Sequence, residues 1–426
     1  MQPPAARWIE ISGVGGLCLF AATGLQYAEA AGFAAAMLLG VLLLKRRQVV
    51  WPAWRNPLLL LPAIFTLYVL CRALLRYVEA PEQAAAIVEW TRYYVVAAGL
   101  PAVVLALLLD ANRARILLVL NVALAALLLA IMRELDAAQL AAYLQGERAF
   151  FGLGNAAGLY ISSALLGVLL LAPWDTQGRS SNAAWLYRMR LALYLAVFAL
   201  LALAFVWHQN RSALLAVFAV FPVLAWHSLR QRRADVAPRF PRWLLIALPL
   251  CLAALLLLGG GEIKQRFAEG YASARLAFSA ETDTPPRSAA GERISLWRIG
   301  LHSAGEYPLF GKGPGSVSEL VREDPVVARH SHLHNLYLQL LVEIGLVGLL
   351  LYLAFMVCLI RGLLRPHAAL SADLRRFIGG SLALFLLINF TQVRIDGTHA
   401  QYFVTLLLGL AMSGSLSSAT DVPRRF

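Results

Sequence analysis

Uninterrupted apolar stretches recur along the whole chain, and they constrain its fold more than any other feature. Each is about 17 to 22 residues long, the length of helix that crosses a hydrocarbon core of about 30 Å at a rise of about 1.5 Å per residue. Of the 426 residues, 60% are hydrophobic and 14% are charged, whereas soluble domains are about 25% charged. We therefore predict an all-α fold, a polytopic transmembrane helical bundle of about 12 spans.

Charged residues between the apolar stretches delimit the predicted spans, and positive charge alternates from one connection to the next. The predicted spans are 11–28, 31–44, 57–75, 93–109, 116–132, 156–173, 191–207, 212–229, 243–260, 336–360, 377–391 and 400–416. Every second connection is basic, beginning with Lys45, Arg46 and Arg47, so both termini are predicted to be cytoplasmic. The net charge of +13 is then explained by topology and contact with anionic membrane lipids, without a nucleic acid partner.

One outward-facing connection is much longer than the others. It runs for about 75 residues, far more than joining two helices requires, and residues 293–304 within it have helical apolar spacing. We expect Ile294, Trp297 and Leu301 to form the apolar face of that helix. The predicted organisation is spans one to nine in residues 1–260, a loop with short helices and the catalytic residues in 261–335, and the last three spans with a short cytoplasmic tail in 336–426.

Neither the cysteines nor the N-terminal region indicates a catalytic or binding site. The four cysteines are widely spaced and lie in or at the ends of apolar runs, which indicates neither a disulfide framework nor a metal cluster: Cys18, Cys71, Cys251 and Cys358. An apolar stretch over 11–27 is followed by Ala28-Glu29-Ala30, which loosely imitates a signal-peptidase site. We expect this stretch to remain as an uncleaved first span.

Arginines on the predicted outer side oppose the charge bias and need another explanation. Arg211 lies in the turn 208–212 between two spans, where it is either a snorkelling anchor or an anion-binding residue. Four others have glutamates nearby, which favours structural ion pairs: Arg72, Arg76, Arg92 and Arg148 with Glu79, Glu82, Glu89 and Glu147.

The long loop concentrates positive charge, which points to an anionic partner. Its basic residues include Lys264, Arg266, Arg275, Arg287, Arg293, Arg298 and Lys312. The planar guanidinium suits bidentate contacts with phosphate, although Arg293 and Arg298 could equally belong to a solvated helix face. Lys312 lies in the glycine-rich stretch 308–315, which lacks the Ser or Thr of a Walker A motif and is expected to be a tight loop.

Three histidines, His330, His332 and His334, end the long loop immediately before the predicted span at 336. Their alternate spacing permits a metal site, but no cysteine accompanies them. Alternatively, one of them is a general base, and His334, nearest the membrane, is the best-placed candidate. The third interpretation is that they only form hydrogen bonds with loop carbonyls. We predict no metal and no cofactor.

Two signatures resemble the bacterial O-antigen ligase family, membrane enzymes that join O-antigen polysaccharide to lipid A-core. One is 293–298 running into 306–315, and the other is 334–348, beginning His334-Asn335-Leu336-Tyr337. Together with Asn210-Arg211-Ser212 they are similar to the arginine, arginine and histidine positions of the family. The resemblance is close over about 205–350. The turn 151–157 departs from the family pattern because it lacks a Pro-Asn pair.

The resemblance implies a glycosyltransferase at the periplasmic face of the bacterial inner membrane, whose donor is O-antigen on undecaprenyl pyrophosphate. The acceptor would be a sugar hydroxyl of lipid A-core, and single displacement would invert the anomeric carbon without a metal. His334 would act as base, while Arg211 and Arg293 would hold the pyrophosphate. Further substrate-binding candidates are Arg298, Lys312, His332, Asn335 and Tyr337.

Three alternatives to a ligase remain. O-antigen polymerases and protein O-oligosaccharyltransferases of the same superfamily use similar donors and differ in the acceptor. A single large outer loop and a short tail after the last span favour a ligase. A transporter or lipid flippase would be expected to place ionisable residues deep inside spans or to break helices in matching halves, whereas here the polar residues gather at the predicted rim.

Overall fold

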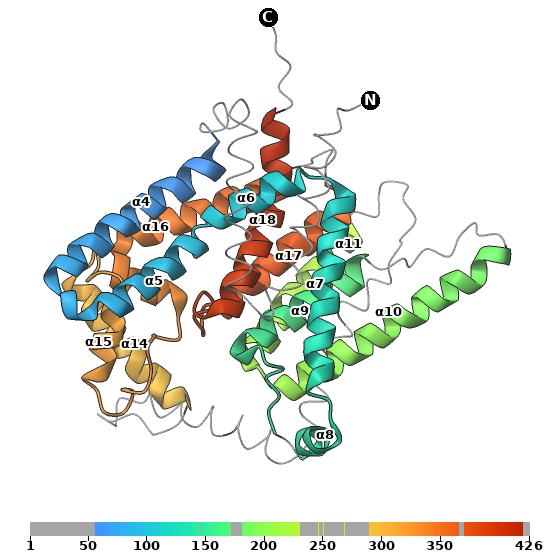
Figure 1. Cartoon of the computed structure of the whole chain (residues 1–426), viewed down its shortest axis with the longest axis horizontal. Coiled ribbons are helices and arrows are strands. Elements are labelled where there is room, and N and C mark those ends of the chain that lie inside the picture. The colour runs from blue at the N-terminus through green and yellow to red at the C-terminus, as the bar shows by residue number, and fades with distance from the viewer. Residues whose placement is uncertain are drawn as a thin grey trace, which may run out of the picture. The chain divides into compact units, whose positions relative to one another are not determined.

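The computed structural model describes residues 56–145, 147–171, 181–230, 289–365 and 370–420, together with residues 246, 250 and 268. Within these ranges the regular structure is helical and contains no strand (Figure 1). The predicted all-α class is therefore confirmed for the described part of the chain.

Six described helices are long and apolar enough to cross a membrane: Pro57–Glu79, Pro81–Leu109, Arg113–Arg133, Gly154–Leu171, Trp185–His208 and Leu336–Leu364. Each overlaps one of the predicted spans 57–75, 93–109, 116–132, 156–173, 191–207 and 336–360, although Pro81–Leu109 begins twelve residues before the predicted start at 93. The predicted spans 212–229, 377–391 and 400–416 are largely helical but are not among the six. Those at 11–28, 31–44 and 243–260 lie outside the described residues, apart from 246 and 250.

The helices fall into two compact units, and the division lies within α7 (Arg113–Arg133). The first unit comprises Met1–Val122, Gln265–Leu370 and Asn389–Phe426. Its described helices are α4 (Pro57–Glu79), η1 (Pro81–Gln83), α5 (Ala84–Ala97), α6 (Leu100–Leu109), α14 (Ala289–Glu306), α15 (Ser316–Arg322), α16 (Leu336–Leu364) and α18 (Thr398–Thr420). In this unit α6 packs along α18, while α4 and α14 both pack against α16 (Figure 1).

Helix α4 shows how the sequence forms a span. Asn56 caps it by accepting a hydrogen bond from Leu58 N at 3.0 Å, and Pro57 occupies the first helical position, where a missing N–H costs nothing. Leu60, Leu67 and Leu74 are exposed on its outer surface. Such an apolar exterior suits a hydrocarbon solvent and would be unfavourable in water.

Helix α16 is interrupted at Gly345, which has φ +69° and ψ −175°. The glycine-rich stretch 308–315 fills the interruption: Lys312 N donates to Val342 O and Gly313 N donates to Glu343 O, both at 2.8 Å, and Leu346 N donates to Pro308 O at 2.9 Å. These bonds satisfy backbone groups that a broken span would otherwise leave unpaired. The tight loop expected at 308–315 is present.

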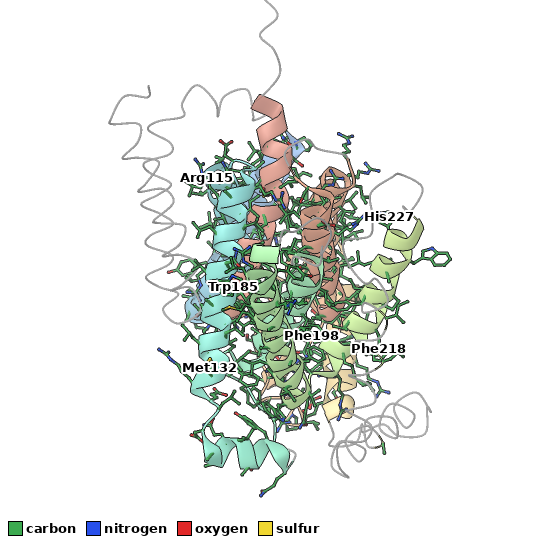
Figure 2. The ribbon with its side chains drawn as sticks, turned by 90° about the vertical axis from the view of Figure 1, so that its right-hand side faces the viewer. Arg115, Met132, Trp185, Phe198, Phe218 and His227 are labelled. Carbon is green, nitrogen blue, oxygen red and sulfur yellow. The ribbon has the colours of Figure 1, made fainter. Side chains whose placement is uncertain are left out.

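The second unit comprises Ala123–Lys264 and Ser371–Ile388. It contains α8 (Ala137–Leu144), η2 (Gly154–Ala156), α9 (Ala157–Leu171), α10 (Ser181–His208), α11 (Arg211–Arg230) and α17 (Ala372–Ile388). Helix α17 packs against α9 and α11, and α10 packs against α9. Figure 2 shows Trp185 and Phe198 along α10, and Phe218 and His227 along α11. The same view shows Arg115 near one end of α7 and Met132 near the other.

Helix α14 confirms the helix expected over 293–304, but its buried face differs from the predicted one. Leu296 is fully buried, whereas Leu301 is 62% exposed. Gly300 lies against Leu333, and a Cβ atom on Gly300 would be 2.7 Å from Cδ1 of Leu333. The prediction counted only large apolar side chains. Because the helix approaches its neighbour closely, small residues occupy part of the contact and move the buried stripe away from Leu301.

Candidate functional site

A small hydrophobic core holds the histidine segment in place. It joins α14, α15, the segment 327–333 and the start of α16, and its members are Leu296, Ala304, Val317, Val321, Val327, Leu333, Leu338 and Val342. Trp297 packs on it and donates through Nε1 to Leu333 O at 3.0 Å. The residue before His334 is thus fixed by both packing and a hydrogen bond, so that the position of His334 depends on this core.

His334 has a backbone conformation that is unusual for its type, with φ +51°. The left-handed region costs a residue other than glycine roughly 1–2 kcal/mol, and such strain persists only where surrounding contacts impose it. The next residue, Asn335, begins α16: its side chain accepts from Tyr337 N at 3.0 Å and from Leu338 N at 3.1 Å. The turn at His334 therefore directs the chain from the loop into the helix.

The rings of the three histidines lie together. The ring centroid of His334 is 4.3 Å from that of His332 and 5.1 Å from that of His330. Nε2 of His334 lies 3.4 Å from Nδ1 of His330, and the His334 backbone N lies 3.3 Å from Nδ1 of His332. Nδ1 of His334 is buried and has no hydrogen-bond partner among the described residues.

Two carboxylates from different parts of the chain contact the histidines of this cluster. Nε2 of His330 is 3.1 Å from Oε2 of Glu292, on α14, and Nε2 of His332 is 3.3 Å from Oδ2 of Asp396. Glu292 also receives hydrogen bonds of 2.5 and 2.7 Å from Arg329. Burial alone would raise the pKa of Glu292, but the hydrogen bonds and charges of Arg329 and His330 outweigh it and lower the pKa.

His334 remains neutral over a wide pH range. Burial lowers its pKa first, and electrostatic interactions with His332, Arg293 and His330 lower it further, to about 2. A hydrogen bond with Gln392 acts in the opposite direction. Arg293 is therefore near enough to influence the charge of His334, which places two of the predicted catalytic residues in one environment.

A second segment, 389–397, contributes residues that the sequence analysis missed. Leu336 N donates to Asn389 O at 2.9 Å and to Gln392 O at 3.1 Å, which ties this segment to the start of α16. Arg394 is buried and donates to Oε1 of Gln392 at 2.7 Å. The available signal was a cluster of polar residues, Gln392, Arg394 and Asp396, in a short connection between two apolar stretches.

The other candidates in the first unit have varied surroundings. Arg298 is exposed on α14. Tyr337 is half-buried, with its ring centroid 4.6 Å from that of Phe390. Lys312 lies 3.6 Å from Oε2 of Glu319, on α15. Asn335 uses its side-chain oxygen to cap α16.

Arg76 and Glu319 form the centre of a second polar cluster in the first unit. Arg76 is buried and donates to Oε2 of Glu319 at 2.5 Å and to Oε1 of Gln83 at 3.1 Å, while Glu79 lies 3.9 Å away. The ion pair expected between Arg76 and a nearby glutamate is present, and Glu319 was not foreseen. Burial would raise the pKa of Glu319, but Gln83, Lys312 and Arg76 together lower it.

Glu343 is a further polar residue that the sequence analysis missed. It is fully buried inside α16, where it accepts hydrogen bonds from Tyr94 Oη at 2.7 Å, Gln339 Nε2 at 2.9 Å and Val317 N at 3.3 Å. Glu343 is thus an ionisable residue inside the predicted span 336–360, which the sequence analysis did not single out. Because its partners come from three helices, Glu343 joins α5, α15 and α16.

Arg211 lies in the second unit, as the first residue of α11. Asn210 precedes it and caps the helix by accepting from Ala213 N at 3.1 Å. Nδ1 of His208 lies 2.7 Å from Ala149 O, and Arg148 donates to His208 O at 2.8 Å. The turn that carries Arg211 is thus fixed by hydrogen bonds on both sides.

Within the described residues, no group of three or more His, Cys, Asp or Glu side chains has the arrangement of a metal site. The histidines instead pair one by one with the carboxylates and with each other. The chemistry that this geometry offers is proton transfer at a partly buried imidazole that interacts electrostatically with a guanidinium.

Comparison with known protein families found a match. Residues 196–353 match the family model described as O-antigen ligase, and the matched range contains Arg211, Arg293 and His334. The matched range is less than half of the chain, and it supports a relationship to the O-antigen ligase superfamily. Members of this superfamily are membrane glycosyltransferase-like enzymes that act on lipid-linked sugars. A search of curated proteins gave no match.

Proposed function

We propose that this protein is an O-antigen ligase, which transfers O-antigen polysaccharide from undecaprenyl pyrophosphate to a sugar hydroxyl of lipid A-core. The observation that carries the proposal is His334: a partly buried neutral imidazole, held in a strained turn, whose buried Nδ1 has no partner among the described residues and whose charge responds to Arg293. A general base needs a free nitrogen, and a departing pyrophosphate needs a fixed cation.

In the proposed reaction the acceptor oxygen attacks the anomeric carbon of the donor while His334 takes the hydroxyl proton. The bond between the anomeric carbon and the phosphate oxygen breaks, and undecaprenyl pyrophosphate leaves with the bonding electrons. Single displacement inverts the anomeric carbon. The pyrophosphate linkage supplies the driving force, so the reaction needs no nucleotide and no metal.

Arg293 has two effects in this proposal. Its guanidinium binds the pyrophosphate and stabilises the negative charge that develops as the sugar leaves. In the unbound protein its charge also helps to lower the pKa of His334. An anionic donor beside Arg293 offsets that charge and raises the pKa of His334, so the imidazole becomes a stronger base when the donor is bound.

The remaining candidates keep supporting roles within the proposal. Arg211 is proposed as a second pyrophosphate-binding residue on the resemblance of Asn210-Arg211-Ser212 to the family. Arg298, Lys312 and Tyr337 are proposed to contact substrate, and His332 and Asn335 to hold the segment around His334. Both substrates are amphiphiles, which fits a site at the outer edge of the inner membrane, facing the periplasm.

The test is the lipopolysaccharide of a strain that lacks the gene. Loss of all O-antigen from core, with lipid-linked polymer accumulating, supports a ligase. A single repeat unit left on core indicates a polymerase, and intact lipopolysaccharide with an unmodified protein indicates a protein O-oligosaccharyltransferase. Complementation with His334→Ala at wild-type protein level should fail to restore O-antigen, since loss of a general base costs about 100- to 10,000-fold in rate.

A further inference from the structure

The three histidines are linked to two carboxylates that the proposed reaction does not use. Glu292 comes from α14 and Asp396 from the segment before α18, so they are separated by about a hundred positions in the sequence and meet only through the fold. Each carboxylate faces Nε2 of a different histidine, and each of those histidines faces His334 with its Nδ1.

The contact with Glu292 determines the hydrogen positions along one side of the cluster. A carboxylate can only accept, so the hydrogen of neutral His330 lies on Nε2, where Glu292 is 3.1 Å away. Nδ1 of His330 is then an acceptor. Since it lies 3.4 Å from Nε2 of His334, the hydrogen of His334 lies on Nε2 and its lone pair lies on Nδ1.

The contact with Asp396 acts on the backbone. Asp396 lies 3.3 Å from Nε2 of His332 and fixes the hydrogen of that ring there. Nδ1 of His332 is thereby free to accept from the His334 backbone N at 3.3 Å. This contact helps to hold the φ of +51° that His334 adopts.

We propose that Glu292 and Asp396 are positioning residues for His334. Glu292 acts through His330 to make Nδ1 of His334 the nitrogen that takes the acceptor's proton, and Asp396 acts through His332 to hold its backbone. The proposal rests on the proposed function, in which His334 is the base. Nδ1 is the nitrogen that is left buried without a partner in the described part of the chain, an arrangement that is costly unless a ligand satisfies it.

The arrangement also stabilises the product of proton transfer. When Nδ1 of His334 takes the proton, the ring becomes a cation whose Nε2–H still donates to His330, and His330 still donates to Glu292. The negative charge of Glu292 thus lies two hydrogen bonds from the new positive charge, and no second proton has to move.

The kinetic test uses Glu292→Gln and Asp396→Asn in purified protein, with undecaprenyl pyrophosphate-linked O-antigen and lipid A-core as substrates. Each substitution should lower kcat by about 10- to 100-fold, the usual cost of losing a residue that orients a functional histidine, while KM for both substrates changes little. The matched control is Glu306→Gln, because Glu306 pairs with His302 at 3.5 Å on the same helix, on an exposed surface. It should retain wild-type kcat.

A double substitution tests the route through His330. His330→Phe keeps a ring but removes the nitrogen that links Glu292 to His334. If Glu292 acts through His330, then Glu292→Gln should lower kcat little further in the His330→Phe background. Additive losses would overturn that route.

Nitrogen NMR of protein labelled with ¹⁵N-histidine tests the hydrogen positions directly and does not depend on turnover. The resonances of His334 are identified by their loss in His334→Asn. Unprotonated Nδ1 and protonated Nε2 support the proposal, and a hydrogen on Nδ1 overturns it.

The outcomes separate this proposal from the proposed function. If His334→Ala is inactive while Glu292→Gln and Asp396→Asn keep wild-type kcat, the positioning role is wrong and the base remains. If His334→Ala retains wild-type activity, the base is wrong and the positioning role falls with it.

Discussion

Gly345, inside α16, lies against the carbonyl group of Leu309 so closely that no side-chain atom fits between them. The contact is backbone to backbone, since Val347 N donates to Leu309 O at 3.1 Å. Gly311 makes the reciprocal approach: a Cβ there would lie 2.5 Å from the carbonyl carbon of Glu343. The glycine-rich loop and the interrupted helix are therefore parts of one structure.

Replacing either glycine by alanine should prevent normal folding. Gly345 and Gly311 both have φ +69°, which alone costs alanine about 1–2 kcal/mol, and the added Cβ would also push two backbones apart. We expect Gly345→Ala and Gly311→Ala to give little monodisperse protein after detergent extraction, with a lower unfolding temperature for what remains.

Gly305→Ala is the matched control for these two substitutions. No atom lies within 4 Å of its Cβ position, and in a helix alanine is favoured over glycine by about 1 kcal/mol. Normal yield and stability are expected. A Gly345→Ala protein as stable as the control would contradict the backbone contact described here.

Glu343 should matter for stability because it is the common acceptor of three buried donors. Glu343→Ala leaves Tyr94 Oη, Gln339 Nε2 and Val317 N without their partner, and each unsatisfied buried group costs about 1–3 kcal/mol. Glu343→Ala should therefore fail to accumulate. Tyr94→Phe removes the hydroxyl donor itself, so no buried donor is left unpaired at Tyr94. This substitution should lower the protein level less than Glu343→Ala does. Measured protein levels that rank the two in the opposite order would refute this role.

The exposed Glu323→Gln serves as the control for this series. It removes a carboxylate from the C-cap position of α15 without leaving a buried donor unpaired, so its yield should equal that of the wild type.

The parts of the fold that the sequence predicted correctly are those encoded by neighbouring residues. Hydropathy located the six candidate spans, and the spacing within 293–304 indicated α14. The cluster of His330, His332 and His334 was visible as a local pattern, although nothing in it revealed the φ of His334. That conformation depends on Leu333 and Trp297, which meet through the tertiary fold.

The missed residues are those whose roles depend on distant partners. Asp396 and Gln392 follow an apolar helix and look like an ordinary connection until the chain brings them to His332 and His334. Glu343 was read as part of a span, and its partners Tyr94 and Val317 reach it only in the folded chain. No periodicity reports such contacts, because the residues concerned are far apart in sequence.

The low pKa of His334 makes the folded protein sensitive to acid. Below its ordinary pKa of 6.5 the unfolded chain binds a proton at this residue, whereas the folded protein does so only near pH 2. The free energy of unfolding should thus fall by about 2 kcal/mol between pH 7 and pH 5 from this residue alone. Glu292 adds to the loss only below its ordinary pKa of 4.5, since its folded pKa is lowered.

His334→Asn isolates this effect, because asparagine tolerates the left-handed region and does not titrate. The measurement is the unfolding temperature in detergent at pH 7, 6 and 5. The wild type should lose more stability than His334→Asn over this interval. Parallel curves for the two proteins would mean that His334 is not buried as described.

Arg293 should control both donor binding and the charge of His334. Arg293→Gln removes one of the positive charges that lower the pKa of His334, so that pKa should rise and the acid-dependent loss of stability should shrink, although burial remains the larger cause. Arg293→Lys keeps the charge and should retain the wild-type pH dependence.

The effect on activity should differ from the effect on pH dependence. Lysine cannot form the two parallel hydrogen bonds that a guanidinium makes with pyrophosphate, so both variants should lower kcat/KM for the donor. Arg293→Gln should lower it more than Arg293→Lys. Arg322→Gln, exposed on α15, should change neither property. An Arg293→Gln protein whose unfolding temperature depends on pH as in the wild type would show that Arg293 does not act on His334, even if its activity is lost.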